Sequence, residues 1–165
     1  MKTGNSQLSD VLHVLLHMAE GGDKPATSET LAAAMQTHPV VLRRLMAGLR
    51  EAGLVASAKG HGGGWVLSCP LNRITLRDVH EALGAPALVS LGFREDRPEC
   101  LVAQAVNEAL GTAVRQAEAA LLAQLGGVTL AGLSRDFHGR LARHRDAGAA
   151  GQHRLEEHVH ERTED

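Results

Sequence analysis

Apolar residues recur every three or four positions over the first part of the chain. From Leu8 to Ala19 this spacing places them on one face of a helix, and Gly21 and Gly22 end the pattern. We therefore expect an amphipathic first helix, followed by a short loop.

Two shorter helices follow, separated by a tight turn at residues 36–38. Thr27 or Ser28 can cap the first of them, and Pro39 suits the start of the second, where its missing N–H costs nothing. Gly53 closes the second helix. Two short helices joined by a tight turn predict a helix-turn-helix. Their inner faces are expected to be Leu31, Ala34 and Met35 in the first and Leu42, Leu45, Met46 and Leu49 in the second.

A strand, a glycine-rich loop and a second strand come next, over residues 54–57, 59–64 and 65–68. This order predicts a β-hairpin wing beside the helix-turn-helix. Four of the five residues 60–64 are glycine, more than a plain hairpin turn needs, and they suit close approach of the backbone to a phosphate or a groove floor. Trp65 is expected to pack at the base of the wing. A helix capped by Thr75 and ended by Gly84 completes a domain of residues 1–84.

A long helix is predicted from Leu101 to Leu125, about 37 Å in length, after an irregular linker of residues 85–100 that could also serve as a sensor loop. The helix has two apolar stripes and so needs two packing partners. Its own domain can cover one stripe and a second subunit the other. The first stripe is Val102, Val106, Ala109, Ala113, Ala117 and Ala120, and the second is Leu101, Ala105, Leu110, Val114, Leu121 and Leu125.

Gly126 and Gly127 break the long helix, and Thr129 caps a short final helix expected to end near Leu141. Residues 101–143 would thus form the dimerisation helix and the final helix, and residues 144–165 a disordered tail. The predicted fold class is mainly α with a small β-hairpin: a winged helix-turn-helix domain followed by a long C-terminal dimerisation helix.

The composition limits the class of protein. Apolar residues make up 44% and aromatic residues 2% of the chain, so the core must be mostly aliphatic. No apolar run is long enough for a membrane span or signal sequence, and two cysteines are too few for a disulfide-stapled fold. We expect a cytoplasmic protein with no membrane partner. The net charge is −2, but residues 40–73 are locally basic, as DNA binding requires, with Arg43, Arg44, Arg50, Lys59 and Arg73 against the single acid Glu51.

Four segments together resemble the signature of the Rrf2 family, bacterial regulators of the IscR, NsrR and CymR type: residues 37–45, 49–55, 59–65 and 74–82. The resemblance covers about residues 7–125. It implies that the second helix of the helix-turn-helix enters the major groove of a double-stranded DNA operator, that the wing reaches the minor groove, and that the long helix forms a homodimer. The candidate DNA-contacting residues are Ser28, His38, Val40, Arg43, Arg44, Lys59, Gly60, His61 and Gly62.

The wing departs from the family pattern Arg-Gly-Pro-Gly-Gly-Gly-Tyr at three positions, with Lys59 for Arg, His61 for Pro and Trp65 for Tyr. Lysine keeps the charge of arginine but loses its planar fork. The resemblance therefore does not establish the base preference of this wing.

The sensor region departs further from the family. Cluster-binding members have three cysteines near the start of the long helix, where this chain has only Cys100. The count excludes a three-cysteine iron–sulfur site and leaves open a cluster held partly by His, Asp or Glu, for which the sequence indicates no ligands. We therefore expect no cofactor. Cys100 is instead a candidate redox or electrophile switch, because a helix N-terminus favours the thiolate and because it joins the domain to the long helix. Two alternatives stay open: Cys100 is an inert thiol, or the effector is a small molecule bound at the linker.

Other chemistry has less support in the sequence. Catalysis would rest on Cys100 with His80 or His61, a pair that nothing fixes, so we expect no enzyme. His13 and His17 lie one helical turn apart, a spacing that can hold a metal, but with no evident third ligand a packed or surface role is expected. The tail histidines are not expected to form a physiological metal site.

The sequence therefore predicts a dimeric DNA-binding transcriptional regulator, a repressor, whose affinity for DNA responds to a redox, electrophile or small-molecule signal. The alternative is a winged-helix module that binds other proteins without sequence-specific DNA binding. A basic surface around Arg43, Arg44 and Lys59 would favour DNA, and an apolar patch there would favour a protein partner.

Overall fold

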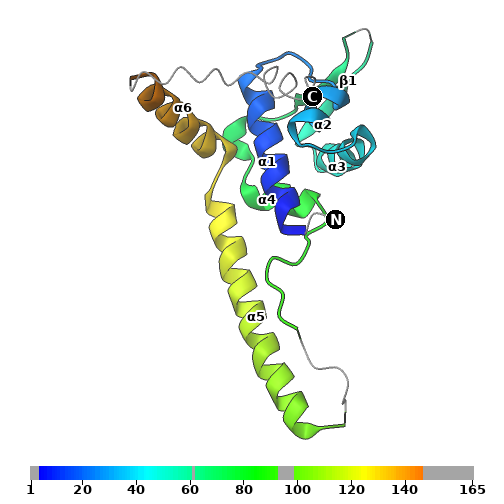
Figure 1. Cartoon of the computed structure of the whole chain (residues 1–165), viewed down its shortest axis with the longest axis vertical. Helices are drawn as coiled ribbons and strands as arrows, with labels where there is room; N and C mark the ends of the chain where they lie inside the picture. Colours follow the sequence, from blue (N-terminus) through cyan, green and yellow to red (C-terminus); the bar gives the residue numbers. More distant parts are fainter. Residues whose placement is uncertain (1–3, 61, 93–98, 147–165) are drawn as a thin grey trace, which may run out of the picture.

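The computed structural model describes residues 4–60, 62–92 and 99–146. The described part is mainly helical with one two-stranded antiparallel hairpin, so the predicted fold class is confirmed. Figure 1 shows a globular part from which one long helix projects. In chain order the elements are α1 (Gly4–Glu20), α2 (Ser28–Ala34), α3 (Pro39–Glu51), β1 (Val55–Ala58), β2 (Gly64–Leu67), the short 3-10 helix η1 (Leu71–Arg73), α4 (Leu76–Ala82), α5 (Leu101–Gly127) and α6 (Leu130–Asp146).

The core of the globular part is aliphatic, as the composition predicts. In α3, Leu42, Met46 and Leu49 are buried as predicted, whereas Leu45 is only half-buried. The helix start signals also act as expected: Thr75 forms a capping box with Asp78, whose carboxylate accepts from the Thr75 N–H at 2.7 Å. The buried apolar residues are Val11, Val14, Leu15, Met18, Leu31, Ala32, Met35, Leu42, Met46, Leu49, Leu54, Val55, Trp65, Ile74, Val79 and Leu130.

The start of α6 is part of this core, a placement that the sequence does not predict. Leu130 is fully buried; its N–H donates to the Ile74 carbonyl at 2.9 Å, and the Leu76 N–H donates to the Val128 carbonyl at 3.0 Å. The helix then packs against α1 and η1. The sequence groups the final helix with the dimerisation helix in residues 101–143, whereas here it packs on the elements of residues 1–84.

Three helices are longer than predicted. α1 begins at Gly4 instead of Leu8. α5 includes Gly126 and Gly127, which were expected to break it, and ends at Gly127. α6 continues past Leu141 to Asp146. The prediction of disorder from residue 144 is therefore wrong for residues 144–146, which are helical; the rest of the predicted tail lies outside the described residues. The sequence at the end of α6 is polar and shows no apolar period, but Ala142 and Arg143 are good helix formers and allow that helix to continue.

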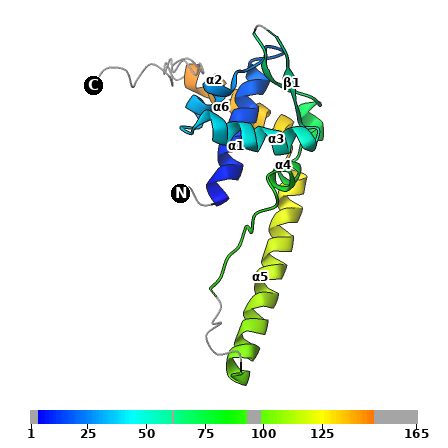
Figure 2. The same ribbon diagram turned by 90° about the vertical axis from the view of Figure 1, so that its right-hand side faces the viewer.

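α5 is a single helix of 27 residues that projects from the globular part (Figure 2). None of its residues is buried. Beside it runs the segment of residues 85–92, where the Leu88 N–H donates to the Glu118 carboxylate at 2.9 Å. One face is half-buried at a spacing of three and four residues, and it consists of Ala103, Asn107, Gly111, Val114, Glu118, Leu122 and Leu125.

A second face of α5 has no cover in the single chain. The first predicted stripe, from Val102 to Ala120, is exposed at all of its positions. Val102 is 72% and Val106 50% exposed. The second predicted stripe is not the half-buried face either: only Val114 and Leu125 of its six residues are half-buried, and the other four are exposed. The expectation that the chain's own domain covers one of the two predicted stripes is therefore wrong.

Candidate nucleic-acid interface

The amino-terminal half of α3 is held on the surface by local contacts. His38 caps the helix, and its Nδ1 accepts from the Val40 N–H at 3.2 Å. On the inner side α3 lies close to α4, because a Cβ at Gly48 would collide with the Ala82 carbonyl. The outer side is open: Val40 is 60% exposed, and Arg44 is exposed too.

Arg43, also on the outer side of α3, forms an ion pair with α2. Its Nη2 donates to the Glu29 Oε1 at 2.9 Å, with the two side chains 55% and 65% exposed. A hydrogen bond from its own backbone lowers the pKa of Glu29, and the Arg43 guanidinium lowers that pKa further. Sequence reasoning missed Glu29, since the two residues are 14 positions apart and only the crossing of α2 and α3 brings them together.

The wing turn depends on glycine conformations. Gly60 and Gly62 have φ values of +103° and +81°, in the region that favours glycine. The Gly63 N–H donates to the Gly60 carbonyl at 2.9 Å and closes the turn. Lys59 is exposed before the turn. His61, a predicted contact residue, lies outside the described residues.

Trp65 packs at the base of the wing as predicted and connects it to α2. The residue is 9% exposed, and its Nε1–H donates to the Ser28 Oγ at 3.0 Å. The backbones of Trp65 and Ala26 exchange two hydrogen bonds of 3.0 and 2.8 Å, and the two segments approach so closely that a Cβ at Gly64 would collide with the Ala26 carbonyl. Ser28 therefore has a structural partner besides its predicted DNA contact.

The predicted DNA-contacting residues that the structure describes belong to α2, to α3 and its N-cap, and to the hairpin turn. Figure 1 shows α2, α3 and the hairpin together at one side of the globular part. We call this the recognition surface, and it consists of Ser28, Glu29, His38, Val40, Arg43, Arg44, Lys59, Gly60 and Gly62.

Cys100 lies far from this surface. It is the exposed N-cap of α5 and its side chain makes no capping hydrogen bond. A helix of 27 residues is about 40 Å long, and Figure 1 shows this end of α5 away from the globular part. Cys100 lies between the domain and the long helix in the sequence, but in the structure it lies at the end of α5 that is away from the domain. The pair of Cys100 with His80 is not assembled either, because His80 is buried in α4.

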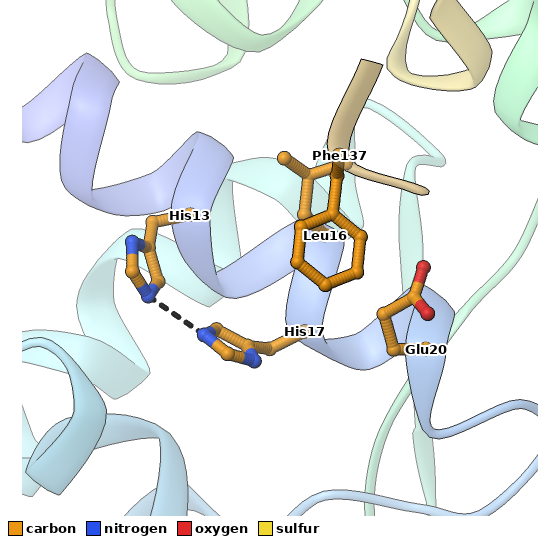
Figure 3. Close-up of a pocket in the computed structure, with 5 residues that line it drawn as sticks. All are labelled: His13, Leu16, His17, Glu20 and Phe137. Atoms are coloured by element: carbon orange, nitrogen blue, oxygen red, sulfur yellow. Dashed lines mark hydrogen bonds between the residues drawn. The ribbon is translucent and has the colours of Figure 1, made fainter. Parts of the chain in front are cut away.

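His13 and His17 contact each other on α1 (Figure 3). Their Nε2 atoms are 2.7 Å apart, beside a pocket of about 180 Å³ that is also lined by Leu16, Glu20 and Phe137 of α6. In the described part of the chain no three His, Cys, Asp or Glu side chains are grouped so that they could hold a metal. His144 is exposed at the end of α6, and the other tail histidines are outside the described residues.

A helix-turn-helix whose second helix lies beside a β-hairpin places this fold among the winged-helix regulators. The chain belongs to the Rrf2 family: the family model, described as an iron-dependent transcriptional regulator, matches residues 5–136. Membership makes the chain a transcriptional regulator and not an enzyme, in agreement with the sequence prediction. Over the described residues no helix has the length and apolarity to cross a membrane.

Two Bacillus subtilis proteins named as HTH-type transcriptional regulators are similar to this chain. YwgB is 37% identical over 83 residues, which are 50% of this chain and 52% of YwgB, so the match spans about half of that relative. YwnA is 26% identical over 126 residues, 76% of this chain and 92% of YwnA. The structure of a transcriptional regulator from Lactobacillus plantarum has a TM-score of 0.67 at 22% identity, over 86% of this chain and 97% of that one, and shows the same fold.

The iron dependence in the family description does not fit the thiols of this chain. The sequence has two cysteines, and they lie in different environments: Cys100 is exposed at the far end of α5, while Cys69 is half-buried after β2. Burial raises the pKa of the Cys69 thiol, and the charge of Asp78 raises it further, which disfavours the thiolate that a metal needs. A cluster held by three cysteines of one chain is thus excluded by the donor set.

Proposed function

We propose that this chain is a homodimeric repressor that binds a pseudo-palindromic DNA operator through α3 and the wing. The observation that carries the proposal is the recognition surface, on which each of the cations Arg43, Arg44 and Lys59 is exposed. Cations of this kind bind phosphates, and arginine also recognises the edge of guanine. The exposed Val40 suits a thymine methyl group. A basic surface favours DNA over a protein partner.

The exposed stripe of α5 supports the dimer. Its alanines allow a second helix to approach closely, and a partner would remove Val102 and Val106 from water. A two-fold dimer presents two recognition surfaces, so its operator should contain two half-sites about 34–36 Å apart or a multiple of this. Occupancy of such a site can block transcription directly.

Selection of bound sequences from a pool of random duplexes tests the proposal. We expect an enriched inverted repeat, and binding that weakens steeply as salt is raised. If the protein binds none of the duplexes, or if the bound duplexes share no motif, sequence-specific DNA binding is contradicted and the protein-interaction module is favoured.

Two single substitutions separate base contacts from phosphate contacts. Arg43→Ala should cost about 1–3 kcal/mol of binding to the selected operator and relax the preference at one base pair, if it contacts guanine. Lys59→Ala should weaken binding to operator and random duplex alike and lower the salt slope by about 1, if it contacts phosphate. Fluorescence anisotropy titrations measure both. Arg77→Ala is the control, because Arg77 is an exposed arginine of α4 outside the recognition surface. Equal losses of DNA affinity in all three variants would contradict the assignment of Arg43 and Lys59 as DNA contacts.

The effector part of the proposal concerns Cys100, which is exposed to oxidants at the tip of α5. Its thiolate can attack a peroxide so that an S–O bond forms, the O–O bond breaks, and the departing hydroxide takes a proton to become water. The sulfenic acid can then react with a second thiol, such as Cys100 of a partner subunit, to give a disulfide and water. Because Cys100 is remote from the recognition surface, its signal must pass through α5 or the partner.

Cys100→Ser should abolish the response of operator affinity to mild peroxide. In the wild-type protein we expect affinity to change on oxidation and to recover with a reductant, since the sulfenic acid and the disulfide are reversible. Cys69→Ser is the matched control and should respond like wild type. If wild type does not respond, or Cys100→Ser responds equally, Cys100 is not the sensor and a small molecule bound at the linker becomes the leading explanation.

A further inference from the structure

Glu29 places a negative charge on the surface proposed to bind a polyanion. Its position is fixed: it lies in the first turn of α2, which Thr27 caps by accepting from the Thr30 N–H at 3.1 Å. The neighbouring Ser28 is bonded to Trp65 of the wing. A carboxylate at this position beside α3 would repel DNA phosphates.

The Glu29 carboxylate also forms an ion pair with Arg43, one of the predicted DNA-contacting residues. The ion pair engages Nη2 of Arg43, whereas a guanidinium has five N–H donors. Donors therefore remain for a base edge while the carboxylate stays bound. Since both side chains are more than half exposed, the pair orients Arg43 without removing it from reach of a ligand.

We propose that Glu29 determines specificity by holding Arg43 for a base edge and keeping it from phosphates. On random DNA a free arginine binds whichever phosphate is near, regardless of sequence. With Glu29 in place, a phosphate must compete with the carboxylate for the same guanidinium and is repelled by it. A neutral guanine edge meets less repulsion. Glu29 should thus weaken non-specific binding more than operator binding, which raises the ratio of the two affinities. This inference rests on the proposed function.

Glu29→Gln removes the charge and keeps the shape of the side chain. We expect affinity for random duplex to rise about two- to five-fold, the scale of an exposed ion pair. The salt slope on random duplex should become steeper by about 0.9, the contribution of one additional phosphate contact. The ratio of operator to random affinity should fall, as measured by anisotropy titrations of both duplexes at several salt concentrations.

A second ion pair in the chain provides a matched control. Arg77 and Glu81 of α4 are joined at 2.8 Å, with side chains 51% and 52% exposed. Glu81→Gln removes the same charge elsewhere and should leave the affinity ratio unchanged. In an Arg43→Ala background, Glu29→Gln should no longer steepen the salt slope, because the arginine that would bind the additional phosphate is absent.

The outcomes separate this inference from the proposed function. If the wild-type protein binds no duplex, the proposed function is wrong and the inference falls with it. If wild type binds and Glu29→Gln leaves the affinity ratio unchanged, or raises both affinities equally, only the inference is overturned. A steeper slope that persists in the Arg43→Ala background also overturns it, because Glu29 then repels phosphate without acting through Arg43.

Discussion

Val106→Glu is expected to convert the proposed dimer to a monomer and to remove operator binding at concentrations where wild type saturates the operator. Val106 lies within the stripe of α5 that is exposed throughout in the single chain. Once a partner covers the stripe, an unpaired carboxylate there costs several kcal/mol, so the dimer dissociation constant should rise about 100-fold or more. A monomer contacts one half-site and loses the affinity that the second half-site adds.

Light scattering at micromolar concentration and anisotropy titration measure the two effects of Val106→Glu. Ala119→Glu is the control, since Ala119 is exposed on the same helix but belongs to neither apolar stripe; it lies about 140° around the axis from Val106. Ala119→Glu should remain dimeric. A wild-type chain that is monomeric at this concentration, or a Val106→Glu variant that still dimerises, contradicts the assignment of the stripe.

Local signals in the sequence predicted most of the elements. Pro39, Thr75 and the glycines of the wing act within a few residues of themselves, and the structure places a helix start or a turn at each of them. The apolar period of α3 likewise predicted three of its buried residues. Such features depend on the backbone nearby and need no knowledge of the rest of the fold.

Contacts between distant elements could not be predicted in this way. The pair of Glu29 and Arg43 depends on the angle at which α2 crosses α3. The apolar periodicity of the two helices does not determine that angle. The position of Cys100 depends on the path of residues 85–92 beside α5, which moves it away from the domain that precedes it in sequence. The sequence shows where the basic residues cluster, so Arg43, Arg44 and Lys59 could be predicted as contact residues. It does not show that Glu29 pairs with Arg43.

The packing of α6 is the clearest example of a contact between distant elements that the sequence did not predict, and Leu130→Ala tests it. Periodicity shows that a helix has an apolar face but not which element covers it, and the sequence grouped this helix with α5. In the structure Leu130 is fully buried in the core shared by α1, α3 and α4. Truncating such a leucine costs about 2–5 kcal/mol of unfolding free energy, a large part of the 5–15 kcal/mol or so that holds a domain together.

Chemical denaturation of Leu130→Ala should therefore show a much lower midpoint than wild type. Val128→Ala is the control two residues away: Val128 is 38% exposed, and its truncation should cost less than about 1 kcal/mol. Because dimer dissociation also lowers stability in a concentration-dependent way, both variants are unfolded at two protein concentrations. If the loss in Leu130→Ala is small, or vanishes at the higher concentration, α6 supports the dimer and not the core of the winged helix.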